Sequence, residues 1–325
     1  MIEVRYDRGS YLPGCDLWLD PRGTRPFAFV SHAHSDHTGH HQRTILTEAT
    51  ARMIRARLGS GGKFQHVLRF WERREFGTFH ATLIPAGHVL GSAQIFIENS
   101  EGTLLYTGDF KLRSSLASEK AESVHAETLI METTYGRPRY KFPPREKTVR
   151  RILDFCRQAL EEDQTPVLLG YSLGKAQEVL AALTGAGLPV MLHGSVWQMT
   201  RLYEELGAVF PSYVKFEPGL VAGHVLLCPP ATARSSMIES LKAKRVAMIT
   251  GWGMDQSAKF RYRCDEVFPL SDHADYDELL EMVERVNPSR VLTLHGYASE
   301  FAQDLRRRGL ESWALTGGNQ MELPI

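Results

Sequence analysis

With 325 residues, 43% of them hydrophobic, the chain can bury the core of one large domain or of two. Its 38 lysines and arginines equal its 38 aspartates and glutamates, so no net charge draws the whole protein to nucleic acid or to a membrane, and binding of a polyanion depends on a local patch. The four cysteines form no CxxC pair and no apolar run reaches the roughly 18 residues of a membrane span, so we expect a cytoplasmic protein outside the membrane.

The first third of the chain alternates short strand-like runs with turns. Strands are predicted at residues 16–20, 27–30, 81–85, 94–98 and 103–106, and a helix at 47–58. This pattern indicates a layer rich in sheet with helices packed outside it.

From about residue 143 the pattern changes to a regular alternation of strands and helices. We expect helices at 146–162, at 174–183 and up to residue 202, and strands at 166–171, 189–193, 224–228 and 245–250. Apolar strands alternating with helices are typical of a small doubly wound α/β unit. The chain then continues with a helix at 276–286, a strand at 290–294, a helix at 299–308 and a closing strand.

Four potential metal ligands lie directly after the predicted strand at 27–30: His32, His34, Asp36 and His37. A strand that ends in such a cluster places imidazoles and a carboxylate at the edge of a sheet, where they can hold a cation. These ligands suit zinc, iron or manganese, and the absence of cysteine argues against a closed structural zinc site. The alternative, a polar turn that is merely rich in histidine, is disfavoured by the further histidines at strand ends downstream.

Three later strands end in residues of the same kind, namely His88, Asp109 and His295. Seven side chains are too many for one catalytic ion, which keeps about three protein ligands and a water. They suit a pair of ions roughly 3.5–4 Å apart. We assign His32, His34 and His88 to one ion, Asp36, His37 and His295 to the other, and Asp109 to a bridging position.

This ligand pattern resembles the metallo-β-lactamase superfamily. Within it, three signatures are similar to the β-CASP nucleases: Glu132 before Thr-Thr-Tyr-Gly, His273 within Leu-Ser-Asp-His-Ala-Asp-Tyr, and His295. Residues 171–178, Tyr-Ser-Leu-Gly-Lys-Ala-Gln-Glu, are similar to a segment at the start of the domain that these nucleases insert. The resemblance spans nearly the whole chain and is greatest to the bacterial ligase-associated DNA exonucleases, which are also described as mRNA 3′-end processing factor-like proteins.

The resemblance implies an α/β fold, a four-layer αβ/βα metallo-β-lactamase sandwich at 1–137 and 270–325 with a Rossmann-like β-CASP domain inserted at 138–269. It implies hydrolysis of a phosphodiester by a hydroxide activated between two divalent ions, for which we favour Zn²⁺ over Mn²⁺. The implied catalytic residues are Asp36, Glu132 and His273. His273 is our choice for the general acid, with Glu132 orienting it and raising its pKa. The alternatives are a surface carboxylate at Glu132 and an ordinary polar residue before a helix at His273.

Several residues are candidates for holding the substrate. Ser172 and Lys175 stand between a strand and a helix and could seat a phosphate, and Ser271 is a similar candidate. The alternatives are helix caps at the serines and a solvated charge at Lys175. Asp272 departs from the family, in which small residues are usual at that position, and this makes the phosphate seat less certain.

A basic strip with aromatic residues comes after Glu132. It includes Arg137 and Arg139, with Tyr135, Tyr140 and Phe142 beside them, and suits single-stranded nucleic acid because phosphates pair with charge and bases stack on rings. Lys259, Arg261 and Arg263 alternate as on one face of a strand and could extend the strip. The alternative is a solvated charged surface.

We expect a DNA exonuclease acting in DNA repair on single-stranded DNA, with DNA ligase or helicase repair proteins as partners. One alternative is an RNA-processing nuclease of the 3′-end processing or ribonuclease J type, which His295 favours because the RNA-cleaving members carry a histidine there. Another is a non-catalytic nucleic-acid-binding scaffold, which the complete ligand set disfavours. The sequence decides neither the direction of cleavage nor exo- against endonuclease action.

Overall fold

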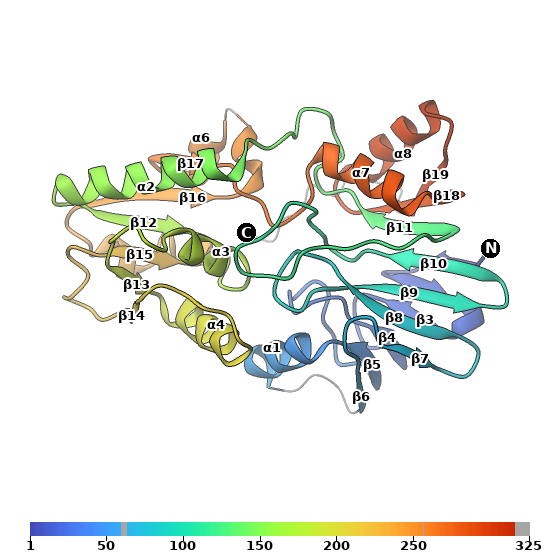
Figure 1. The fold of residues 1–325 in the computed structure, drawn as a ribbon. Coiled ribbons are helices and arrows are strands. Elements are labelled where there is room, and N and C mark those ends of the chain that lie inside the picture. Colours follow the sequence, from blue (N-terminus) through green and yellow to red (C-terminus); the bar gives the residue numbers. More distant parts are fainter. Residues whose placement is uncertain (60–63, 256, 316–325) are drawn as a thin grey trace. The chain divides into compact units, whose positions relative to one another are not determined.

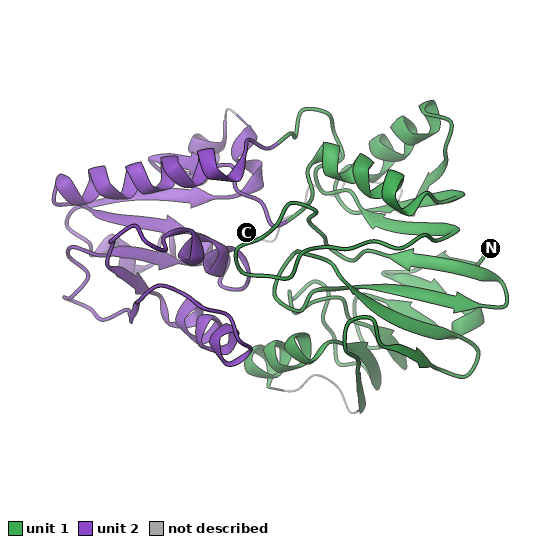
Figure 2. Ribbon diagram, viewed as in Figure 1, with its two compact units in different colours: residues 1–141, 273–324 green, residues 142–272, 325 purple. Residues whose placement is uncertain are grey.

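The computed structural model describes residues 1–59, 64–255 and 257–315, and its chain divides into two compact units (Figure 2). Within the described residues, unit 1 combines Met1–Lys141 with 273–315, and unit 2 is Phe142–Asp272. The domain boundaries predicted from the sequence lie a few residues earlier in each case. Among the described residues, no helix is long and apolar enough to cross a membrane.

Unit 1 contains two sheets (Figure 1). The first has the order β1 (Arg5–Tyr6), β2 (Ser10–Leu12), β3 (Leu17–Leu19), β4 (Phe27–Phe29), β5 (Arg43–Leu46) and β6 (Phe64–Val67). The second has the order β19 (Glu311–Ala314), β18 (Arg290–Leu294), β11 (Thr128–Glu132), β10 (Gly102–Tyr106), β9 (Ala93–Asn99), β8 (His80–Pro85) and β7 (Arg73–Glu75).

The core of unit 1 has two layers. One lies between the two sheets, and the other lies on the outer face of the second sheet. Alternating side chains of β3 and β4, such as Leu19 and Phe29, pack with Leu83 and Ile95 of the second sheet. The opposite face of the second sheet is covered by α7 (Tyr276–Val286) and α8 (Ala298–Arg307), while α1 (Glu48–Leu58) contacts β6 of the first sheet. Helices therefore lie outside both sheets, as the predicted four-layer fold requires.

Strand direction explains why distant ligands meet. β10, β11 and β18 pair in parallel, and β8 runs the same way because antiparallel β9 lies between it and β10. The carboxyl ends of all four therefore lie along one edge of the sheet. The Ala93 amide donates to the carbonyl of Ser31, which follows β4, and this bond of 2.9 Å joins the first sheet to that edge.

Unit 2 is a doubly wound α/β unit. Its parallel sheet has the order β14 (Val214–Lys215), β13 (Val190–Leu192), β15 (Val225–Cys228), β12 (Thr165–Leu169), β16 (Lys244–Ile249) and β17 (Glu266–Phe268). Its helices are α2 (Arg145–Glu161), α3 (Lys175–Ala182), α4 (Gly194–Glu205), α5 (Ser236–Glu239) and α6 (Ala258–Tyr262). Apolar side chains on both faces of the sheet are buried, which matches the uninterrupted apolar runs of these strands.

Candidate metal centre and active site

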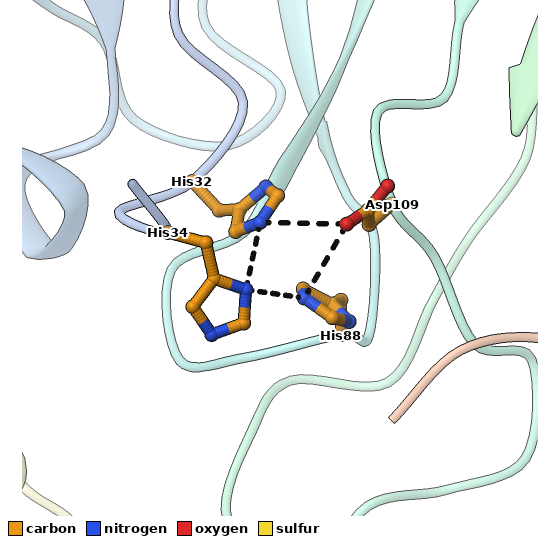
Figure 3. Close-up of side chains that lie close together, drawn as sticks. All are labelled: His32, His34, His88 and Asp109. Carbon is orange, nitrogen blue, oxygen red and sulfur yellow. Dashed lines mark hydrogen bonds and ion pairs between the residues drawn. The ribbon is translucent and has the colours of Figure 1, made fainter. Parts of the chain in front are cut away.

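Four side chains from three strand ends converge in unit 1 (Figure 3). His34 Nδ1 lies 3.0 Å from His32 Nε2 and 3.1 Å from His88 Nε2. Asp109 Oδ2 lies 3.6 Å from His32 Nε2 and 3.8 Å from His88 Nε2. Ligands about 2.0–2.1 Å from a tetrahedral zinc ion are separated by about 3.3 Å, so this set fits one ion.

The charge states of these groups also suit a cation. Burial, together with the neighbouring His37, holds the pKa of His32 well below its ordinary value, so the ring is neutral. Burial alone would raise the pKa of Asp109, but the histidines around it outweigh this and hold the pKa well below its usual range. His32 and Asp109 are therefore in the forms that bind metals, a neutral imidazole and an ionised carboxylate.

A second group surrounds the same oxygen of Asp109. His37 Nε2 lies 3.3 Å from Asp109 Oδ2 and 3.7 Å from Asp36 Oδ2, and the ring of His295 lies 5.8 Å from that of His37 between centroids. Asp36 stands at the exposed rim of this group. Of the two predicted ligand sets, the first has its ligand atoms within 4.8 Å of one another, while the second lies beside Asp109 through His37, and its role as a metal site stays a prediction.

A carboxylate that the sequence analysis missed, Asp20, fixes the rings of this centre. It is buried after β3, and its Oδ2 accepts hydrogen bonds from Tyr106 Oη at 2.9 Å and Ser31 Oγ at 2.5 Å. It also accepts the Nδ1 proton of His37 at 2.8 Å, because an ionised carboxylate can only accept. Nε2 of His37 is then directed at Asp109, where a cation could take the place of its proton, as expected of a metal-ligating imidazole with an outer carboxylate.

The same carboxylate determines the tautomer of His32 through a serine. The single hydroxyl proton of Ser31 goes to Asp20, so the contact of 2.9 Å between Ser31 Oγ and His32 Nδ1 requires the imidazole to donate. His32 Nε2 therefore carries a lone pair facing His34 and His88. A cation satisfies ring nitrogens that face one another in this way. A single aspartate at the end of the predicted strand 16–20 was the only signal for Asp20 in the sequence.

Glu132 and His273 form a pair beside the metal centre. His273 Nδ1 lies 2.9 and 3.1 Å from the two carboxylate oxygens of Glu132, which is buried at the end of β11. Glu132 also accepts from the amide of Phe110 at 3.0 Å and from the hydroxyl of Thr134. His273 Nδ1 is 3.9 Å from Asp109 Oδ2. The orienting contact predicted between the two residues is therefore present.

The structure contradicts the phosphate contact predicted for Lys175. Its side chain is 2% exposed, and its ammonium donates to Asp272 Oδ1 and to the carbonyl of Leu270, both at 2.9 Å. A lysine buried against a carboxylate is an internal ion pair rather than a solvated charge or a phosphate ligand. Asp272, whose presence had no explanation in the sequence, is the partner that lets this lysine stay charged inside unit 2.

Neither serine acts as the helix cap considered as an alternative. The α3 helix begins after Gly174, whose amide donates to Gln177, and Ser172 Oγ instead lies 2.8 Å from Ser195 Oγ. The α7 helix is capped by Asp275, so Ser271 has no such role. Substrate contacts by Ser172 and Ser271 remain predictions.

The stacking surface predicted for the basic strip is wrong at two of its three rings, because Tyr135 and Tyr140 are buried, while Phe142 is half-buried. Tyr135 is 3% and Tyr140 0% exposed. Arg137 lies over the ring of Tyr297 at 4.1 Å and pairs with Glu300, and Arg139 donates to the hydroxyl of Tyr140 at 2.6 Å. These contacts tie the strip into unit 1, and substrate contact by the two arginines stays a prediction.

The extension of that strip along one face of a strand is also wrong. Lys259 and Arg261 belong to the short helix α6, in which alternate residues do not share a face. Each is paired within unit 2, Lys259 with Glu266 at 3.2 Å and Arg261 with Asp255 at 3.7 Å.

Sheets faced by helices, with histidines and carboxylates gathered at the strand ends, define a metal-dependent hydrolase fold, and the chain belongs to the metallo-β-lactamase superfamily in its β-CASP nuclease group. Residues 260–315 match the family described as the Zn-dependent metallo-hydrolase RNA specificity domain. The chain is similar over 99% of its length to a probable DNA ligase of Opitutus terrae, at 50% identity, and spans 32% of that protein.

Other relatives carry nuclease names. A probable RNase MJ4 of Methanocaldococcus jannaschii is 23% identical, with 98% of this chain and 93% of that protein covered. The 5′ exonuclease Apollo of Gallus gallus is 28% identical, with 88% and 63% covered. A solved structure of a protein of unknown function from Enterococcus faecalis has the same fold, with a TM-score of 0.57 at 15% identity, covering 82% of this chain and 75% of that one.

Proposed function

We propose that the chain is a metal-dependent nuclease that hydrolyses phosphodiester bonds in DNA as an exonuclease. The observation that carries the proposal is the placement of the Glu132–His273 pair beside the ligand groups that share Asp109. A metal centre alone would suit many hydrolases, whereas an adjacent imidazole with its own carboxylate supplies the proton that a nucleotide leaving group needs.

The residues that would hold the cations are those predicted from the sequence: His32, His34 and His88 for one ion, Asp36, His37 and His295 for the other, with Asp109 between them. We propose zinc for both because the donors are mainly neutral imidazoles, with manganese as the alternative. Activation of water as a nucleophile and stabilisation of negative charge on the phosphate are the chemistry that such ions supply when bound.

The protein's own side chains perform the remaining steps. Glu132 accepts the Nδ1 proton of His273 and so fixes the ring, which leaves Nε2 to pass a proton to the departing oxygen. The negative charge of Glu132 also favours the protonated, proton-donating form of that ring. Asp20 keeps His32 and His37 in the tautomers that present Nε2 to a cation.

The choice of DNA over RNA is supported by the relative named as a DNA ligase, which matches nearly the whole chain at 50% identity. That match also supports our expectation of a DNA ligase as a partner in repair. We propose single-stranded DNA as the substrate. RNA is the second candidate, supported by the RNA specificity domain at residues 260–315 and by the relative named as a probable RNase.

A direct assay tests the proposal. The purified chain is incubated with single-stranded DNA, duplex DNA and RNA of one sequence, each labelled at either end, with zinc or with manganese. We expect stepwise shortening of single-stranded DNA that stops on chelation and returns when metal is restored. A parallel preparation of Asp109→Asn reports any contaminating nuclease. Preferred cleavage of RNA would transfer the proposal to the second candidate, and binding without cleavage, with less than one ion per chain, would favour the scaffold.

A further inference from the structure

The turn that carries His295 has an unusual backbone. His295 has a φ of 58°, in the left-handed region that a residue with a side chain seldom adopts, and Gly296 follows with a φ of 54°. A Cβ at Gly296 would lie 2.4 Å from Thr134 Cα and 2.6 Å from the Thr133 carbonyl oxygen. The turn after β18 is therefore pressed against the segment after β11, and something must hold it there.

Thr133 holds the turn in place with hydrogen bonds from both its backbone and its side chain. Its amide donates to the Leu294 carbonyl at 2.8 Å, and its own carbonyl accepts from the Tyr297 amide at 2.9 Å. Its hydroxyl lies 2.9 Å from the Leu294 carbonyl and 2.7 Å from that of His295. Thr133 is fully buried, so no water can take over the role of this hydroxyl.

We infer that Thr133 is a positioning residue for His295, and that its hydroxyl holds the left-handed backbone which directs this imidazole towards His37 and Asp109. The amide of Thr133 binds only the carbonyl before the turn. The hydroxyl reaches the carbonyl of His295 itself, where the strained φ lies. Without it, the His295 carbonyl loses this donor and the turn can relax into a more common conformation, which moves the ring away from the second ligand group.

The adjacent threonine provides a matched control. The amide and hydroxyl of Thr134 both donate to Glu132 Oε2, so its side chain serves the Glu132–His273 pair, although its backbone also packs against the His295 turn. Two neighbouring threonines of similar chemistry therefore serve different imidazoles. Loss of either hydroxyl removes one hydrogen bond, but only loss of the Thr133 hydroxyl acts on a proposed metal ligand.

The test is the zinc affinity of the weaker of two sites, measured by competition with a chromophoric chelator in Thr133→Val, Thr133→Ser and Thr134→Val. The inference rests on the proposed metal pair. We expect Thr133→Val to lower this affinity by about 10- to 100-fold, the range for groups that support metal ligands, while Thr133→Ser and Thr134→Val stay near wild type. Circular dichroism and thermal melting verify the fold, and Thr133→Ala replaces the valine variant should that one not fold.

The outcomes separate the inference from the proposed function. A wild-type chain that binds a single ion refutes the metal pair, whatever the variants do. A wild-type chain with two ions and an unchanged affinity in the Thr133 variants refutes the positioning role. An equal loss in the serine variant shows that the methyl group, and not the hydroxyl, supports the turn, which also overturns the inference. None of these measurements depends on nuclease activity.

Discussion

The two units bury charged side chains in opposite ways. In unit 2 the ammonium of Lys175 meets the carboxylate of Asp272, and the charges cancel within the protein. In unit 1 the buried carboxylates of Asp20 and Asp109 gather around His37, and their field outweighs the effect of burial, so that the pKa of that imidazole is raised well above its ordinary value. In unit 1 the two carboxylates thus favour a positive charge at His37. A paired charge indicates structure, and an excess of one sign indicates a site for a ligand.

Removing the shared carboxylate should have the largest effect. Asp109→Asn keeps the shape of the side chain but loses the charge that both ligand groups use. We expect nuclease activity to fall to background, bound metal to be lost and the melting temperature to fall, because the histidines that hold the pKa of Asp109 low favour its charged form in the folded protein. Activity near that of the wild type would exclude this centre as the catalytic site.

The Glu132–His273 pair should affect the rate without affecting the metal. His273→Ala is expected to lower kcat by about 10²- to 10⁴-fold, the usual contribution of a general acid, with metal content preserved. Single-turnover cleavage and metal analysis of the same preparation measure both quantities. Simultaneous loss of both ions would instead make His273 a ligand.

Breaking the ion pair of unit 2 should affect stability alone. Lys175→Met removes the ammonium that pairs with the buried carboxylate of Asp272 and is expected to lower the free energy of unfolding by about 3–5 kcal/mol, with zinc affinity unchanged. The double variant Lys175→Met with Asp272→Leu removes both charges and should recover much of that loss. A stable single variant that has lost affinity for DNA would restore the phosphate contact predicted from the sequence.

Asp20→Asn should give the smallest effect, since it changes how ligands are held rather than the ligands themselves. The amide replaces one acceptor oxygen by an NH2 group, which would face a donor on either side of Asp20: the Ser31 amide, or the cluster of Ser31 Oγ, Tyr106 and His37. We expect zinc affinity about 10- to 100-fold weaker and little change in fold. Unchanged affinity would show that Asp20 is a packing element only.

The ligands could be predicted from the sequence because each follows an apolar strand, and the ends of strands that run in one direction meet at one edge of a sheet. It did not reveal Asp20, because a lone aspartate after a strand gives no indication of which imidazole it will meet across 17 residues of chain. The wrong predictions for Lys175 and Tyr140 have a different cause. Lys175 and Tyr140 have surface-like chemistry but are buried by tertiary packing, which periodicity cannot register in a short segment.

A single oxygen atom, Asp109 Oδ2, faces His32, His88 and His37 at 3.3–3.8 Å. Two cations held by these groups would have to divide the negative charge of one carboxylate, so filling one position must alter the affinity of the other by the same factor in both directions. Occupancy should therefore depend on the free metal concentration in a way that two independent sites cannot reproduce, and the shape of a loading curve records whether the ions help or hinder each other.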